Sequence, residues 1–424
     1  MSISQLTPTF SSSQVPSTIN WGCDYDLVIV GGGIVGLTLA AALKNSGLNI
    51  LLVEAKPTSA AVAKGQAYAV HLLSARIFQG IGIWQKMLPN IEKYHQVCLS
   101  DADYSNIVKF QTSDLGKDAK TGELGYVAEH YAILEPLQEF VHDCRNVTYI
   151  CPGEVIKTEN QLDAVNITIK INDHTQIIRS KLLVAADGSK SAIRQAAGIK
   201  TKGWKYWQSC IVAFIKPEKP HNNTAYEKFW SSGPFAILPL PGNRCRVVWT
   251  APHEEAKALC SLSDEQFLAE LSKRYGQQMG KLELLGERFI FQVQLMQSDR
   301  YVLPRLALIG DAAHNCHPVG GQGLNLGIRD AAALAEVIQT AHQNCQDIGN
   351  ISILKKYEIW RTKENLAILG FTDLLDRVFS NNFLPLVILR RMGLWMMQKV
   401  PMIRVFALKL MIGLKGKTPV LGKQ

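Results

Sequence analysis

The sequence lacks several features that would place it in other classes of protein. Its nine cysteines are scattered singly, without a Cys-x-x-Cys pair, which argues against a disulfide framework and favours a reducing, cytoplasmic compartment. Residues 2–20 lack the basic cluster and apolar run of a signal peptide, so we expect residues 1–22 to form a mobile tail. The 424 residues are 47% hydrophobic and 19% charged, which predicts a globular chain of two or three domains.

Acidic residues are absent from the C-terminal segment. Between Arg377 and Gln424 there are nine Lys or Arg and no Asp or Glu, out of 45 basic and 36 acidic residues in the whole chain. The rest of the chain therefore holds 36 residues of each sign and is neutral. Because the net charge of +9 belongs to one segment, we expect no nucleic-acid partner.

The apolar stretch Phe383–Leu414 has no run of 18 residues without charge, and two prolines interrupt it. A transmembrane span is therefore not expected. Basic residues spaced among Trp, Met, Leu and Phe predict helices that lie on an anionic membrane surface, on the inner face of a membrane. The alternative is a C-terminal helix that packs against the core and carries solvated Lys and Arg. The absence of acids favours the membrane interpretation.

A dinucleotide-binding pattern is present near the N-terminus. A buried strand, a turn of the form Gly-x-Gly-x-x-Gly, a helix and a second strand with a final carboxylate follow one another: Tyr25–Val30, then Gly31, Gly33 and Gly36, then Leu37–Leu43, then Leu48–Val53 and Glu54. This order predicts a βαβ unit that binds a dinucleotide.

Each residue of this pattern has an expected role. Gly31 permits the tight turn, Gly33 lets a pyrophosphate approach, and Gly36 lets the helix and strand pack. Glu54 is placed to accept hydrogen bonds from ribose hydroxyls, which favours FAD or NAD over NADP. The pattern alone does not distinguish FAD from NAD.

A second glycine-rich stretch, Gly310–Asp330, lies between a short apolar run at Leu306–Ile309 and a helical pattern from Leu324 to Ile338. Glycines let the backbone approach a ligand, and a helix N-terminus points N–H groups and a positive dipole end at one place. With the Asp311 carboxylate beside it, this turn suits a ligand with a sugar hydroxyl at one end and an anion or electron-rich ring at the other.

These residues resemble the signature of the FAD-dependent aromatic hydroxylases, in particular the ubiquinone-biosynthesis hydroxylase family. The resemblance implies that Asp311 holds the ribityl chain of FAD. It also implies that the backbone of Gly321, Gly323, Leu324 and Asn325 lies against the pyrimidine edge of the flavin. There a helix N-terminus would stabilise the negative charge of reduced flavin.

Two further segments resemble the same family. Asp187 and Gly188, followed by Ser191 and Arg194, resemble its second FAD motif. The resemblance implies that Asp187 and Gly188 face the flavin side and that Arg194 is a structural or phosphate clamp. In residues 65–84, Gln66 stands where the family usually has Arg, which removes a positive charge near the flavin.

Residues 124–129 also follow the family. Here Glu129 and Tyr131 are candidate cofactor contacts or simply part of a strand-to-helix junction.

Residues 199–298 contain many short strands with Gly and Pro turns, which predicts a mainly antiparallel substrate domain. The run 233–239 resembles the family segment that lines the ring pocket. It implies that Phe235, Leu238 and Pro239, together with Pro318, line an apolar substrate pocket. We expect Trp204 and Trp207 to be core residues of this sheet, and Ser263 to cap a helix ending at Tyr275.

His314 and His317 could suggest a metal pair. They lie in a turn with a proline and without a third ligand nearby, so no metal site is predicted. Cys316, between them, is expected to pack rather than react.

The sequence thus predicts an α/β fold with a Rossmann-like FAD-binding domain (23–198 and 299–345), an antiparallel-sheet substrate domain (199–298) and C-terminal helices (346–424). The resemblance implies a monooxygenase that hydroxylates a prenylated phenol or quinone precursor with NAD(P)H and O₂ through a flavin hydroperoxide. The sequence identifies no catalytic residue. The alternatives are an epoxidase or reductase acting on another lipid, and a non-catalytic scaffold for other quinone-biosynthesis enzymes.

Overall fold

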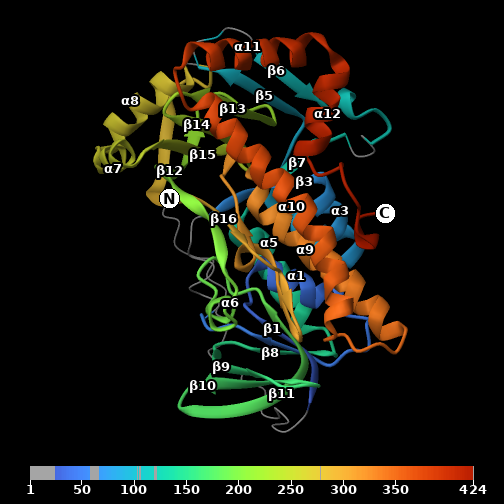
Figure 1. Ribbon diagram of the computed structural model, residues 1–424. Coiled ribbons are helices and arrows are strands. Elements are labelled where there is room, and N and C mark those ends of the chain that lie inside the picture. Colours follow the sequence, from blue (N-terminus) through green and yellow to red (C-terminus); the bar gives the residue numbers. More distant parts are fainter. Residues whose placement is uncertain are drawn as a thin grey trace.

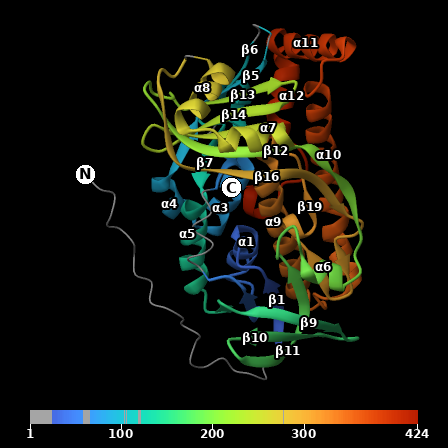
Figure 2. The same ribbon diagram turned by 90° about the vertical axis from the view of Figure 1, so that its left-hand side faces the viewer.

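The computed structural model describes residues 24–57, 66–102, 104, 107–118, 122–276 and 278–423 (Figure 1). The predicted tail at 1–22 lies outside these residues, as does Gly65. The described chain forms three sheets with helices packed around and between them (Figure 2).

The first sheet is Rossmann-like. Its strand order is β17-β18-β11-β1-β2-β8, and β10 and β9 extend it from β11. The strands are β1 (Tyr25–Val30), β2 (Ile50–Val53), β8 (Val147–Ile150), β9 (Glu154–Asn160), β10 (Val165–Ile171), β11 (His174–Ala185), β17 (Val302–Leu303) and β18 (Leu306–Leu308). β1 pairs in parallel with β2 and β11, and β11 pairs in parallel with β18. These near-continuous apolar runs form strands because helices bury them.

Three helices form the layer that covers the first sheet. They are α1 (Ile34–Ala42), α5 (His130–His142) and α9 (Gln322–Gln343), and α1 packs against both of the others. β10 and the first part of β11 form an antiparallel hairpin, and β11 then runs without a break to Ala185 inside the sheet. One strand therefore connects the hairpin to the core.

The second sheet is mainly antiparallel, as predicted for the substrate domain. Its order is β19-β16-β12-β15-β14-β13-β5-β6. The strands are β5 (Gln96–Asp101), β6 (Ile107–Gln111), β12 (Thr201–Pro217), β13 (Thr224–Trp230), β14 (Gly233–Leu240), β15 (Arg244–Pro252), β16 (Leu282–Ser298) and β19 (His314–Asn315). One face is covered by α7 (His253–Ser261) and α8 (Asp264–Tyr275).

The structure differs from the predicted domain boundaries at β5 and β6. These strands precede residue 199, yet β5 pairs in parallel with β13 and so belongs to the second sheet. Pairing between strands distant in sequence leaves no local signal, so residues 23–198 do not form the FAD-binding domain alone. A third, small sheet links the two larger ones: β4 (Ile91–Tyr94), β7 (Gly125–Glu129) and β3 (Ala67–His71), which leads into α3 (Leu72–Ile81).

The expectation that Trp204 and Trp207 are core residues was wrong. Their side chains are 43% and 54% exposed. They lie at the start of β12, where pairing with β16 has begun but pairing with β15 starts only at Gln208. This end of the strand projects beyond the layered part of the sheet, and Trp204 instead contacts the Arg377 guanidinium at 4.9 Å. By contrast, Ser263 caps α8 as predicted, and the structure adds a full capping box with Gln266.

Three helices complete the chain: α10 (Ile351–Phe379), α11 (Leu384–Lys399) and α12 (Pro401–Met411). α10 packs against α9, α11 against β6, and α12 against the turn η2 (Thr112–Asp118). α11 lies across the end of the molecule farthest from β10 (Figure 1). Among the described helices, none has the length and apolar character needed to span a bilayer.

Candidate cofactor and substrate site

Four neighbouring parallel strands end at the same edge of the first sheet. Val30 of β1 is paired with Val53 of β2 and Ala185 of β11, and Ala185 is paired with Leu308 of β18. The residues that follow are Gly31, Glu54, Asp187 and Asp311. The fold therefore brings the three predicted motifs together at the strand ends, where α/β sheets bind their ligands.

The glycine turn after β1 has the local geometry that the expected roles require. A Cβ on Gly31, where φ is +111°, would lie 2.3 Å from the Ala186 carbonyl oxygen, and a Cβ on Gly36 would lie 2.0 Å from that of Gly31. A Cβ on Gly33 would meet nothing within 4 Å. Gly31 and Gly36 therefore permit close packing, whereas Gly33 faces open space at the N-terminus of α1, which suits a phosphate.

Glu54 holds this turn in place. Its Oε2 accepts a 2.7 Å hydrogen bond from the backbone N–H of Gly32, and its Oε1 accepts one from Lys56 at the same distance. Each carboxylate oxygen has a second lone pair, so Glu54 keeps the capacity to accept from ribose hydroxyls.

The second motif connects to the third through Arg194. Its Nη1 donates to the Ala312 carbonyl at 2.8 Å, and its Nη2 donates to that of Ser189 at 2.9 Å. Of the two roles predicted for Arg194, these contacts support the structural clamp. Asp187 Oδ1 is buried without a hydrogen-bond partner among the described residues, so this carboxylate can still accept a bond from a ligand.

Asp330, at the end of the late motif, organises the turn that carries Asp311. Its Oδ2 accepts from the Gly310 N–H at 3.1 Å and contacts His314 Nε2 at 2.6 Å, while its Oδ1 accepts from Arg361 Nε at 2.7 Å. Burial alone would raise the pKa of Asp330, but His314 and Arg361 outweigh burial and lower it to about 2. Sequence reasoning missed this role, because Arg361 lies 31 residues away.

The two histidines of the late motif have structural partners. His314 contacts Asp330, and the buried His317 Nε2 lies 3.5 Å from Asp376 Oδ1. In the described part of the chain, no three His, Cys, Asp or Glu side chains gather as metal ligands would. Cys316 packs near Leu326 and Leu369, and burial raises the pKa of its thiol to about 12. The thiol therefore stays protonated near neutral pH.

The turn before α9 is held against β3 and α3 by the Asn325 side chain. Asn325 Nδ2 donates to the carbonyls of Ala69 and Gly321 at 2.8 and 2.7 Å, and its Oδ1 accepts from the His71 N–H and the Ser74 hydroxyl. Its side chain is fully used within the protein. Asn325 is completely buried and does not line the cavity described below, so it fixes the shape of the turn, and the implied contact of its backbone with the flavin stays a prediction.

A cavity of about 550 Å³ separates this turn from the second sheet. One wall is the turn itself, the opposite wall is the inner face of the sheet, and a third part comes from α12. The cavity wall contains six residues that were predicted to contact the cofactor or substrate: Asp311, Pro318, Gly321, Gly323, Leu324 and Leu238. Further apolar side chains on the wall are Val97, Phe110, Ala236, Val248, Phe291, Leu408, Met411 and Ile412.

Two of the predicted pocket residues, Phe235 and Pro239, do not line this cavity. Side chains alternate between the two faces of a strand, and in β14 the even-numbered Pro234, Ala236 and Leu238 face the cavity. Phe235 instead packs edge-on against Trp249 on the other face, beneath α8. The implied segment was right, but the prediction did not separate its two faces.

Several polar side chains also face the cavity, and sequence reasoning did not identify them as a group. They include Tyr68, Glu227 and Arg246. The Tyr68 hydroxyl donates to Gln66 Oε1 at 2.6 Å, so Gln66 has an internal role in place of a charge. Alternation along β13 and β15 is the signal that could have placed Glu227 and Arg246 on one face. Glu129 pairs with Arg244 at 2.7 Å, which supports its structural interpretation.

The sequence as a whole matches known flavoproteins. Residues 24–121 and 146–365 match the family described as FAD binding domain. The chain is 34% identical over 385 residues to the ubiquinone hydroxylase UbiL of Rhodospirillum rubrum, covering 90% of this chain and 88% of that protein. The chain belongs to the FAD-dependent ubiquinone-biosynthesis hydroxylase family.

Other comparisons agree with this assignment. A Synechocystis sp. protein, described as uncharacterized protein slr1300, is 49% identical to this chain over 397 residues. The match covers 94% of this chain and 95% of that protein. The p-nitrophenol 4-monooxygenase PnpA of Pseudomonas putida has the same fold, with a TM-score of 0.77 at 17% identity over 92% of this chain and 98% of that chain. The predicted FAD-dependent monooxygenase class and its fold are therefore confirmed.

The residues of the site fit FAD. The open space at Gly33 suits the pyrophosphate, and the unpartnered Asp187 Oδ1 offers an acceptor beside it. The Asp311 side chain is accessible to the cavity but otherwise surrounded by protein, and this burial raises its pKa. Gly31, Gly33, Gly36, Glu54, Asp187, Gly188 and Asp311 would hold the dinucleotide, with the turn before α9 against the flavin.

Proposed function

We propose that this monooxygenase hydroxylates the aromatic ring of a prenylated phenol or quinone precursor, with NAD(P)H as the reductant and O₂ as the oxygen source. The observation that carries the proposal is the cavity between the flavin-binding turn and the second sheet, whose lining is mostly apolar. Such a cavity suits a lipophilic ring. The relative named ubiquinone hydroxylase supports the same substrate class.

When bound, FAD supplies the reduction and activation of oxygen. The protein's own residues position and protect the reactants. Leu238, Val248 and Phe291 on the sheet wall would hold the ring toward the turn and exclude water. The N-terminus of α9, beginning after Gly321, would stabilise negative charge on the reduced ring system.

The test is the visible spectrum of the purified protein, followed by anaerobic reduction with NADH or NADPH, with and without a 2-prenylphenol. We expect a bound-flavin spectrum, faster bleaching when the phenol is present, and an aerobic product with one added oxygen atom. A product with two added hydrogens would instead indicate a reductase. Flavin binding without substrate-dependent NAD(P)H oxidation would indicate a scaffold.

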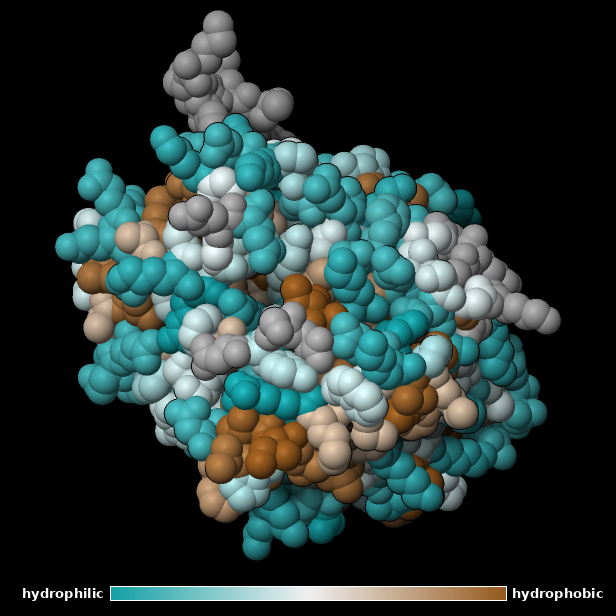
Figure 3. Space-filling model, turned by 90° about the horizontal axis from the view of Figure 1, so that it is seen from above, coloured by the Kyte–Doolittle hydropathy of each residue, from teal (hydrophilic) through white to brown (hydrophobic). Residues whose placement is uncertain are grey.

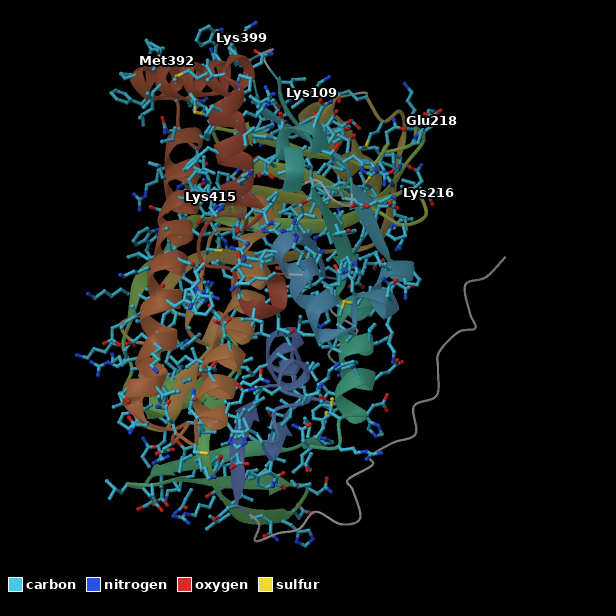
Figure 4. The ribbon with its side chains drawn as sticks, turned by 90° about the vertical axis from the view of Figure 1, so that its right-hand side faces the viewer. Lys109, Lys216, Glu218, Met392, Lys399 and Lys415 are labelled. Atoms are coloured by element: carbon cyan, nitrogen blue, oxygen red, sulfur yellow. The ribbon has the colours of Figure 1, made fainter. Side chains whose placement is uncertain are left out.

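We also propose that α11 and α12 lie on an anionic membrane surface, which makes the protein peripheral to a membrane. Large apolar side chains are exposed along both helices (Figure 3). They are Phe383, Leu384, Ile388, Leu389, Met392, Trp395, Met396, Val400, Met402 and Phe406. Met392 and Lys399 project from α11 at this end of the molecule (Figure 4). Apolar side chains beside a cation suit a bilayer with anionic head groups.

Pairing accounts for part of the basic excess of this segment. Arg390 and Arg391 contact Asp101 at 3.0 and 3.3 Å, and Arg404 contacts Asp114 at 2.8 Å. These arginines face acids supplied by other segments, so the absence of acids within the segment is partly a requirement of packing. The exposed apolar surface is therefore the stronger support for the membrane.

α12 joins this apolar surface to the cavity. Met402 and Phe406 are 79% and 55% exposed, whereas Leu408, Met411 and Ile412 face the cavity. A prenylated substrate leaving a bilayer would meet apolar side chains along this whole path, which supports an entry route beside α12.

The membrane proposal is tested with the double variant Met402→Glu/Phe406→Glu. We expect the wild-type protein to sediment with anionic liposomes and the double variant to remain in the supernatant. Ile177→Glu is the matched control, because Ile177 is 67% exposed on β11, distant from α12. Equal sedimentation of wild type and double variant would contradict the proposal and leave this surface to a protein partner, such as another quinone-biosynthesis enzyme.

A further inference from the structure

One carboxylate on the cavity wall has no partner among the residues that the structure describes. Glu227 lies on β13 and is flanked on the same face by Leu99 of β5, Ala236 of β14 and Ala225 of its own strand. These side chains are apolar, and the two alanines leave room beside the carboxylate. No hydrogen bond or ion pair joins Glu227 to another residue in the part of the chain that the structure describes.

The nearby carboxylate of Asp101 shows the contrast. Asp101 lies one position further along the same face of β5, and it is held by Arg390 and Arg391. Its charge is thus compensated within the protein. Glu227 has no such cation within the described ranges, and burying an uncompensated carboxylate in an apolar cavity costs free energy. Groups kept in such an environment are candidates for chemistry with a ligand.

The protonation of Glu227 is suited to a reaction near neutral pH. Burial raises its pKa to about 8. Burial lowers the pKa of His71 to about 3 and raises those of Cys210 and Cys316 to about 12. The remaining charged or titratable groups that face the cavity or lie beside Glu227 are Tyr68, Tyr94, Tyr226, Arg246, Asp311, and Asp101 with Arg390 and Arg391.

We propose that Glu227 accepts the proton of the phenolic substrate's hydroxyl group and orients that group. This inference rests on the proposed hydroxylase function. The phenolic O–H bond breaks, its proton bonds to a carboxylate oxygen of Glu227, and the electron pair of the bond remains on the phenolic oxygen. The step gives a neutral carboxylic acid and a phenolate, and no redox partner is needed.

The phenolate donates electron density to the ring carbons ortho and para to its oxygen. These carbons become better nucleophiles toward the electrophilic oxygen supplied with FAD. A phenol has a pKa of about 10, and a general base works best when its own pKa lies near the operating pH. Glu227 meets this condition, whereas a carboxylate with an ordinary pKa would be a weak acceptor.

The test compares Glu227→Gln with wild type as FAD-loaded enzymes. The probe is a 4-nitrophenol with an ortho alkyl chain, whose phenolate is yellow. At the same pH, we expect a larger ionised fraction of bound probe in wild type than in the variant. We expect kcat for a 2-prenylphenol to fall about 100- to 10,000-fold in the variant. In wild type, kcat/KM should rise with pH through an apparent pKa near 8, and this rise should be absent in Glu227→Gln.

Two further variants keep this test decisive. Lys228→Gln is the matched control, because Lys228 points to Trp230 and Arg274 instead of the cavity, and it should behave as wild type. Glu227→Asp retains an acceptor on a shorter side chain, so the pH inflection should persist at a lower rate. This variant decides the question if Glu227→Gln fails to retain FAD.

Two results would overturn the role of Glu227 while leaving the hydroxylase function intact. One is that Glu227→Gln changes neither the ionisation of the bound probe nor the pH profile. The other is that Glu227→Asp loses the inflection although its FAD content is normal. If wild type hydroxylates no prenylated phenol, the proposed function fails instead.

Discussion

Gly33 and Gly36 stand three residues apart in one turn, yet a methyl group should have different effects at the two positions. Gly36→Ala places a Cβ 2.0 Å from a backbone oxygen, whereas Gly33→Ala meets only open space. We expect Gly33→Ala to keep the Tm of the apoprotein but weaken FAD binding about tenfold, or about 1.4 kcal/mol. Gly36→Ala should lower the Tm itself. Thermal unfolding and FAD titration check this, and equal Tm values for the two variants would contradict it.

Asp330 provides a prediction about acid stability. Its pKa in the folded protein is about 2, below its unfolded value of about 3.9. Its contribution to stability is therefore fully present above about pH 4 and is lost as the pH falls through about 2. Asp330→Asn removes one of the two carboxylates that pair with the buried Arg361 and leaves only Glu364, so we expect the free energy of unfolding to fall by about 1–3 kcal/mol at neutral pH.

Urea unfolding at neutral and acid pH measures this effect. Asp163→Asn is the control, since Asp163 pairs with Arg179 on the exposed surface and should change stability little. A stability of Asp330→Asn equal to that of the control would show that the buried network does not hold the turn.

At the scale of elements, β14 presents one face to the cavity and the other to the core beneath α8. Phe235→Ala should lower the free energy of unfolding by about 3–5 kcal/mol, because it empties a buried site beside Trp249. Leu238→Ala removes a half-buried side chain from the cavity wall, so it should change KM for the aromatic substrate with a smaller effect on stability. Chemical denaturation measures the effect on stability, and steady-state kinetics measures the effect on KM. If only Phe235→Ala changed KM, the assignment of the two faces of β14 would be reversed.

At the scale of the whole molecule, the exposed helices and the cavity should act together on substrates with long chains. With a long-chain prenylphenol presented in anionic vesicles, we expect Met402→Glu/Phe406→Glu to raise KM several-fold. With a short-chain, water-soluble phenol the same variant should match wild type. The difference should shrink at high salt, because screening weakens attraction to the vesicle. Equal KM values for the long-chain substrate would contradict a membrane route beside α12.

Local patterns in the chain were sufficient for the elements that depend on near neighbours. The glycine spacing at 31–36, the strands around it and the N-cap at Ser263 were all predicted, because their geometry is set by residues a few positions apart. Predictions failed where partners are distant in sequence. The place of β5 and β6 in the second sheet and the exposure of Trp204 and Trp207 depend on strand pairings that leave no local signal.

By itself, the sequence was sufficient to predict the family and the FAD cofactor, because the motifs that carry the resemblance lie in short runs of the chain. Only the tertiary structure decided what surrounds the substrate. In the folded chain, Phe235 lies in the core and Glu227 faces the cavity. The C-terminal arginines pair with Asp101 and Asp114, and α12 forms part of the cavity wall. The physical reason is that burial and charge pairing depend on which distant segments meet, and that is a property of the folded chain.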